Sequence, residues 1–132
     1  MYKNKKILAV VMARGGSKGI KNKNLKKING LPLVSIAGKL LKKINIIDRS
    51  IISTDSKKIS LCGKESGLSV FFRRPKNLSK DMTSDFKVIN HSLKMMEKID
   101  STKYEVVLMI QPTSPMREKK DIIKCIKILV NK

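Results

Sequence analysis

Two adjacent glycines and a group of cations follow the first apolar run of the chain, in the stretch VMARGGSKGIKNKNL (residues 11–25). Glycines let the backbone approach a ligand closely and adopt positive φ angles, and successive exposed N–H groups can then form a concave anion site. The adjacent glycines are Gly15 and Gly16, and the cations are Arg14, Lys18, Lys21 and Lys23. A phosphate chain is the ligand that such a stretch suits best.

The spacing of these residues matches neither of the two common phosphate-binding loops. The Gly-Lys-Ser/Thr ending of the P-loop is absent, because the chain reads GGSKG, and the dinucleotide pattern G-x-G-x-x-G is absent too. From the residues alone we predict an anion-binding loop. The alternative, a solvated loop that simply carries lysines, stays open at this point.

The charge balance of the chain is strongly basic. Its 132 residues contain 30 Lys and Arg against 10 Asp and Glu, a net charge of +20. Such a surface attracts nucleotides, nucleic acid and acidic lipid, although a general lysine bias of the source proteome would look the same. With 2 tyrosines, 3 phenylalanines and no tryptophan, the chain lacks aromatic-interleaved basic stretches that stack single-stranded bases, which argues against nucleic acid as the partner.

Cysteine and histidine are too sparse for a zinc site. Cys62 and Cys125 lie far apart, form no CxxC pair, and are predicted as small buried hydrophobes, while the only histidine, His91, is expected to have a packing or surface role. The cysteine usage fits a reducing compartment, and no apolar run is long enough to cross a membrane. We therefore expect a soluble, cytoplasmic protein with no membrane partner.

Stretches with the composition of strands alternate with helical patterns along the chain. Strands are predicted over residues 7–13, 49–55, 68–75 and 105–115, the last breaking into a loop at two prolines. Helices are predicted over residues 33–43 and 56–67, then with Phe86, Ile89, Leu93 and Met96 on one face, and over 118–130 with Ile122, Ile126 and Leu129 on one side. Asn29-Gly30 marks a turn, and Gly67 is the expected C-cap of the second helix.

This alternation predicts an α/β layered domain with a mainly parallel sheet, spanning residues 1–132 as one unit. Ligands of open sheets bind beyond the carboxyl ends of the strands. The predicted ends are Ala13-Arg14, Thr54-Asp55, Arg73-Arg74 and Gln111 to Ser114, all of which carry polar or charged residues. Asp55 could face this site or cap the next helix, and Asp81 and Asp85 are expected to cap or flank a helix start.

Four segments carry a resemblance to a known family. ARGGSKGIKNKNL is similar to the N-terminal signature of the acylneuraminate cytidylyltransferases, the CMP-sialic acid synthetases. DRSIISTD resembles the second-strand segment of that family, FFRRPKNLSKDMTSDFKVINHSL its Arg-Pro, Leu-Ser and Asp-x-x-Ser stretch, and LMIQPTSPMR its Gln-Pro-Thr-Ser-Pro-Leu-Arg block. The four occur in the family's order and cover nearly the whole chain.

The resemblance implies a three-layer Rossmann-like nucleotidyltransferase fold and a defined reaction. A nonulosonic sugar acid of the sialic, legionaminic or pseudaminic type would attack the α-phosphate of CTP, release pyrophosphate and form a CMP-sugar for cell-surface glycans, with Mg²⁺ assisting. Such chemistry needs an aligned triphosphate and neutralised charge more than covalent help from the protein.

The resemblance also implies roles for individual residues. Arg14 and Lys23 match positions that contact the CTP phosphates, with Lys23 stabilising charge at the reacting phosphate, and the loop contributes Gly15, Gly16, Ser17, Lys18 and Asn24 to nucleotide binding. Arg74 and Ser84 match positions near the cytosine and ribose. Gln111, Thr113 and Ser114 match the block that faces the sugar acid.

Family members are longer than this chain, so the family's later part is expected to be missing here. That part holds two metal-binding aspartates, which have no counterpart in this sequence, and a dimerisation and lid segment; a homodimer therefore also has to be considered. Three hypotheses follow: a short or truncated cytidylyltransferase, a module that holds CTP or CMP without turnover, and a generic polyanion binder. Steep salt dependence without base preference would indicate the third.

Overall fold

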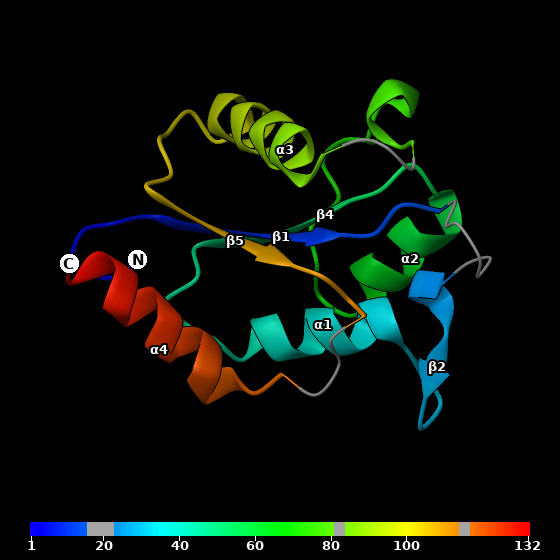
Figure 1. The fold of residues 1–132 in the computed structure, drawn as a ribbon, viewed down its shortest axis with the longest axis horizontal. Coiled ribbons are helices and arrows are strands. Elements are labelled where there is room, and N and C mark those ends of the chain that lie inside the picture. The colour runs from blue at the N-terminus through cyan, green and yellow to red at the C-terminus, as the bar shows by residue number, and fades with distance from the viewer. Residues whose placement is uncertain (16–22, 81–83, 114–116) are drawn as a thin grey trace.

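Three parallel strands form the central sheet of the computed structural model, which describes residues 1–15, 23–80, 84–113 and 117–132 (Figure 1). The strand order is β4 (Arg49–Ser53), β1 (Ile7–Met12) and β5 (Val106–Ile110), so β1 lies in the middle. Val10 is paired with Ile51 on one side and with Met109 on the other. Residues 7–11 are fully buried, as the continuous apolar run predicts for a strand covered on both faces.

Helices cover both faces of the sheet and make three layers (Figure 1). One face packs against α1 (Leu33–Lys42), α2 (Lys57–Glu65) and α4 (Lys119–Val130), the other against α3 (Asp85–Ile99). The side chains of β1 alternate between these layers: Ile7, Ala9 and Val11 belong to the core of the first face, and Leu8 and Val10 to that of the second. The predicted α/β class with a parallel sheet is confirmed.

Short elements follow the predicted turns. β2 (Lys27–Ile28) and β3 (Leu31–Pro32) form a small antiparallel hairpin, and its turn residues Asn29 and Gly30 have φ values of 52° and 83°. Positive φ at both central residues is what a two-residue hairpin of this kind requires. Gly67, with φ at 106°, follows directly after the C-cap residue of α2, so the predicted glycine ending of that helix is confirmed. Two short 3-10 helices span Lys23–Leu25 and Lys76–Leu78.

The third predicted strand, residues 68–75, is wrong as a strand. The segment runs beside β4, but only Ser69 forms a ladder pair, with Ile51, and the next backbone contact to that side is the Arg74 N–H donating to the Thr54 carbonyl at 2.8 Å. Val70 and Phe71 are consecutive and both exposed. The segment therefore pairs with β4 at one position only and is not a regular strand.

The buried faces of α3 and α4 are rotated from those predicted. α3 buries Val88, Ser92 and Met96, with Ile89 and Leu93 partly buried, while Phe86 in its first turn is 77% exposed. α4 buries Ile122 and Ile126, whereas Leu129 is 55% exposed and Cys125 is exposed rather than buried. Both buried lines follow strict i, i+4 spacing, which leaves residues at i+3 on the flank of the helix.

An ion-pair cluster fixes the end of α3 that lies away from the predicted site. Asp100 accepts hydrogen bonds from the guanidinium of Arg49, at 2.8 Å from Nη2, and from the hydroxyl of Tyr104. The bond from Arg49 lowers the pKa of the Asp100 carboxyl, while burial and the bond to Asp100 raise the pKa of Tyr104 to about 12. The cluster joins β4, α3 and the segment that leads into β5.

None of the described helices is both long and apolar enough to traverse a bilayer.

Candidate functional site

Four segments of the chain meet at the carboxyl edge of the sheet. Arg14 follows β1, Asp55 follows β4, Arg74 lies on the segment beside β4, and Gln111 follows β5. Backbone bonds hold the first three segments in order, since the Ala13 N–H donates to the Ser53 carbonyl at 3.1 Å and Arg74 is bonded to Thr54. Because all three strands are parallel, their carboxyl ends lie at one edge, where open sheets bind ligands.

The entrance of the glycine-rich loop is held by two side chains. The Gly15 N–H donates to Asp55 Oδ1 at 2.7 Å, and Asn24 Nδ2 donates to the carbonyl of Arg14 at 3.1 Å. The resemblance places Asn24 among the nucleotide contacts. In the structure Asn24 is almost fully buried, and its Nδ2 is bonded to the backbone at the entrance of the loop. Gly16, Ser17, Lys18 and Lys21 lie outside the described residues, and Lys23 begins the short 3-10 helix that ends the loop.

Asp55 faces the loop and does not cap the following helix. Ser56 is the N-cap of α2, with its Oγ accepting from the Ile59 N–H at 3.2 Å, and the Ser56 N–H in turn donates to Thr54 Oγ1 at 3.1 Å. The hydroxyls of Thr54 and Ser56 therefore stabilise the turn and the start of the helix, and the carboxylate of Asp55 between them binds the loop. Of the two roles left open for Asp55, the geometry selects the one at the site. The signal in the sequence was a carboxylate at the carboxyl end of a predicted strand.

Arg74 is buried at this edge, with 4% of its surface exposed. Its Nε donates to Ser53 Oγ at 3.1 Å and its Nη2 to the Ser53 carbonyl at 2.8 Å. Burial lowers the pKa of the Arg74 guanidinium, and the charge of Arg14 lowers it further, while Asp55 and Asp85 oppose the shift. Arg74 therefore lies close enough to Arg14, Asp55 and Asp85 for their charges to interact with its own. Sequence reasoning did not anticipate that Arg74 would also fasten the end of β4.

The residues assigned to the ribose and sugar side lie at the start of α3 and after β5. Ser84 is exposed and caps α3, its Oγ accepting from the Lys87 N–H at 3.3 Å. Asp85 occupies the first turn of α3, as expected for a carboxylate near a helix N-terminus, and accepts from Gln111 Nε2 at 3.5 Å. Gln111 and Thr113 are exposed, whereas Ser114 and Asp81 lie outside the described residues.

His91 packs against Phe72. Its ring meets the edge of Phe72 with a centroid distance of 5.1 Å, and its buried Nδ1 has no hydrogen-bond partner among the described residues. Burial lowers the pKa of His91, and the charge of Arg74 adds to this. The packing role expected for this histidine agrees with the contact, and its nearness to the site is an addition from the structure.

The unfolding free energy should therefore depend on pH through His91. Because the folded state binds the imidazole proton more weakly than the unfolded chain, stability is complete above the ordinary histidine pKa of about 6.5 and decreases as pH falls below it toward the lowered folded value. Urea unfolding at neutral pH and at about pH 5.5 should show this decrease in the wild type and a smaller one in His91→Gln. The same decrease in both proteins would contradict the assignment to His91.

The described residues do not supply a protein cage for a metal ion. Within residues 1–15, 23–80, 84–113 and 117–132, no three His, Cys, Asp or Glu side chains are grouped so that they could hold one. At the site itself, Asp55 is bonded to the Gly15 N–H and Asp85 to Gln111. Both described carboxylates of the site are thus engaged by the protein itself, and the Mg²⁺ that the resemblance implies stays an expectation.

A groove of about 610 Å³ lies beside the exit of the loop, between the β2–β3 hairpin and α2. Its lining includes Lys26 and Lys27 from the hairpin side and Lys58, the half-buried Cys62 and Glu65 from α2. Arg14, Asp55 and Arg74 do not line this groove.

Comparison with known proteins finds a family and relatives that match most of the chain. Residues 8–132 match the family described as Cytidylyltransferase. The chain is 33% identical over 123 residues to an N-acylneuraminate cytidylyltransferase from Escherichia coli, covering 93% of this chain and 28% of that protein. It is 34% identical over 109 residues to a CMP-N,N'-diacetyllegionaminic acid synthase from Campylobacter jejuni, covering 83% of this chain and 46% of that protein.

A solved structure has the same fold. It is a CMP:2-keto-3-deoxy-manno-octonic acid synthetase in complex with CTP, superimposed with a TM-score of 0.75 at 17% identity, over 96% of this chain and 48% of that chain. At this identity the likeness is one of fold. The chain thus spans about half the length of this structure, and half or less of the two relatives named above.

Proposed function

This chain belongs to the cytidylyltransferase family, and from that premise we propose that it transfers CMP from CTP to a nonulosonic sugar acid with release of pyrophosphate. The observation that carries the proposal is the position of the ARGGSKG loop, whose entrance at Arg14 and Gly15 lies at the carboxyl edge of the sheet beside Asp55 and Arg74. The names of the relatives, which concern acylneuraminic and legionaminic acids, support this class of acceptor.

The proposed reaction is an in-line displacement at the α-phosphorus. The anomeric hydroxyl oxygen of the sugar acid forms a bond to that phosphorus, the bond to the oxygen that bridges the α- and β-phosphates breaks, and pyrophosphate leaves with the electron pair while the hydroxyl loses its proton. The chain's part is to align the triphosphate and to neutralise the charge that builds up on it. We assign that part to the loop N–H group of Gly16 with the cations Arg14 and Lys23, because the Gly15 N–H already donates to Asp55.

The nucleotide and the sugar acid would bind along the same carboxyl edge of the sheet. Arg74 and Ser84 would flank the cytosine and ribose, and Gln111, Thr113 and Ser114 would face the sugar acid. Exposed Gln111 and Thr113 at the end of β5 suit a ligand with a carboxylate and several hydroxyls, because short polar side chains can both donate to and accept from it. The predicted homodimer stays a prediction.

An assay of pyrophosphate release tests the proposal. The protein is incubated with CTP and N-acetylneuraminic acid in the presence of Mg²⁺, with three controls: no sugar acid, ATP in place of CTP, and no Mg²⁺. Release that requires both CTP and the sugar acid supports the transfer reaction. Selective binding of CTP without release would instead support a module that holds the nucleotide without turnover.

A further inference from the structure

A single peptide plane at the start of the loop is held from both of its edges. The plane joins Arg14 to Gly15: its carbonyl accepts from Asn24 Nδ2 at 3.1 Å, and its N–H donates to Asp55 Oδ1 at 2.7 Å. Asn24 lies at the far end of the loop and Asp55 comes from β4, so the two bonds join three separate segments of the chain. A peptide plane fixed at both edges cannot rotate without breaking one of these bonds.

Close packing restricts the same plane. A Cβ atom added to Gly15 would lie 2.9 Å from the Cβ of Ser56 and 3.5 Å from Asp55 Oδ1. The loop backbone therefore passes against the turn after β4 at a distance that only glycine allows. Ser56 is itself fixed as the N-cap of α2, so the surface against which Gly15 rests belongs to a regular element of the fold.

We propose that Asp55 is a positioning residue for the nucleotide loop, acting with Asn24 to set the orientation of the Arg14–Gly15 peptide plane. The inference rests on the proposed function and adds to it a residue that touches no substrate. With the plane set, the backbone at Arg14 and Gly15 has one orientation before the ligand arrives. Backbone that is ordered in advance loses less conformational entropy on binding, which increases affinity.

The charge of Asp55 distinguishes positioning from direct contact. A carboxylate repels a triphosphate, so Asp55→Asn should keep or increase the affinity for CTP, provided that its amide oxygen still accepts from the Gly15 N–H. Asp55→Ala removes the acceptor and should weaken CTP binding by about tenfold, as expected for a lost hydrogen bond to a charged group. If CTP binding instead required the negative charge of Asp55, both variants would lack that charge and would lose affinity alike.

Asp48 offers a matched control at the other end of the same strand. Its Oδ2 accepts from the Ile7 N–H at 2.7 Å, the same kind of bond as that between Asp55 and Gly15, but at the amino end of β1. Asp48→Ala should cost a similar amount of stability and leave CTP affinity unchanged. Thermal unfolding of all three variants checks that they are folded at the temperature of the titration.

Amide exchange of Gly15, measured by NMR on the nucleotide-free protein, tests the bond directly. The Gly15 amide should be protected in the wild type, Asp55→Asn and Asp48→Ala, and should exchange faster in Asp55→Ala. Unchanged exchange in Asp55→Ala, equal loss of CTP affinity in the two Asp55 variants, or equal loss in Asp48→Ala would each overturn the inference. A wild type that binds no CTP would overturn the proposed function and the nucleotide role with it, while the exchange data would still decide whether the bond forms.

Discussion

Replacing Arg14 or Lys23 with alanine is expected to weaken CTP binding by about 10- to 100-fold for each residue, because the proposed function assigns both cations to the phosphates and each change removes a full charge and a hydrogen-bond donor. Arg14 follows β1 directly and is near enough to Arg74 to lower the pKa of that guanidinium. Lys23 stands at the point where the loop returns into the short 3-10 helix. The two positions therefore bracket the loop.

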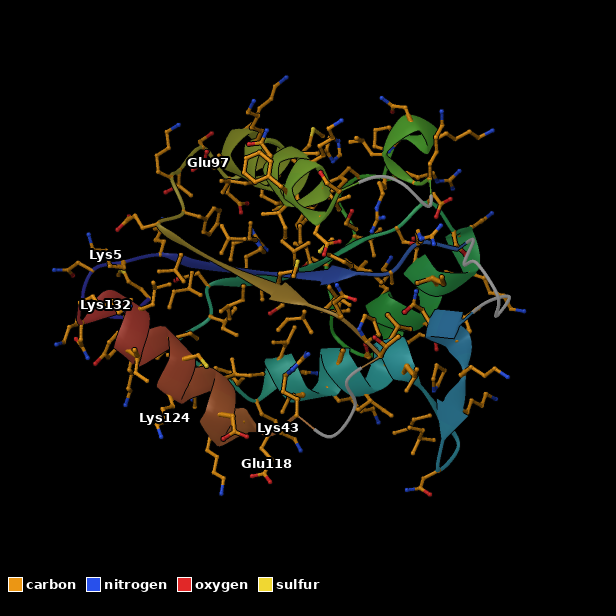
Figure 2. The ribbon with its side chains drawn as sticks, in the orientation of Figure 1. Lys5, Lys43, Glu97, Glu118, Lys124 and Lys132 are labelled. Atoms are coloured by element: carbon orange, nitrogen blue, oxygen red, sulfur yellow. The ribbon has the colours of Figure 1, made fainter. Side chains whose placement is uncertain are left out.

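Lys132→Ala is the control for this prediction. Figure 2 shows Lys132 at the end of the molecule where the two termini lie, opposite the end at which β1 opens into the loop. With a net charge of +20, a protein that bound CTP by its overall field would respond alike to the loss of any one cation. Calorimetric titration of the three variants decides between these cases, and equal effects from all three would refute the loop assignment.

Replacing Ile126 with alanine is expected to lower the free energy of unfolding by about 2–5 kcal/mol. Ile126 is fully buried in the core between the sheet and the helices of the first face, where it belongs to the same cluster as Val106 and Ile110 of β5. Removing its side-chain carbons leaves a cavity that a close-packed core fills only in part. Urea unfolding, monitored by circular dichroism, measures the change.

Leu129→Ala provides the comparison on the same helix. Leu129 is 55% exposed, so its truncation should change the unfolding free energy by no more than about 0.5–1 kcal/mol. Helical periodicity alone placed both residues on one side of α4, and the structure separates them. A cost for Leu129→Ala as large as that for Ile126→Ala would mean that α4 packs with a different face.

Periodicity and turn chemistry were enough to predict most of the fold. The continuous apolar run at residues 7–13 indicated the buried central strand, and Asn29-Gly30 and Gly67 marked a hairpin turn and a helix end, because positive φ restricts the residue type so strongly. Residues 68–75 were misassigned because an apolar, aromatic composition does not reveal how many ladder pairs the backbone forms. Among residues 68–75 only Ser69 forms one, and only the packed structure shows this.

The sequence predicted which segments meet at the candidate site, but not the hydrogen bonds that join them. A parallel sheet requires that Arg14, Asp55 and Gln111 end at one edge, so their proximity followed from the strand order. The sequence could not reveal that Asp55 bonds Gly15, that Asn24 bonds Arg14, or that Arg74 is turned onto Ser53. Each of these contacts joins residues at least 10 positions apart, and its existence depends on how the segments pack.

Calorimetric titration with CTP, and with ATP as the control at the same moderate salt concentration, tests the central claim most directly. The account predicts that CTP binds at least about tenfold more tightly than ATP, a difference of about 1.4 kcal/mol, because the site recognises the base as well as the phosphates. It also predicts that the preference is retained when the salt concentration is raised. Equal affinities for the two nucleotides, both falling steeply with added salt, would contradict it.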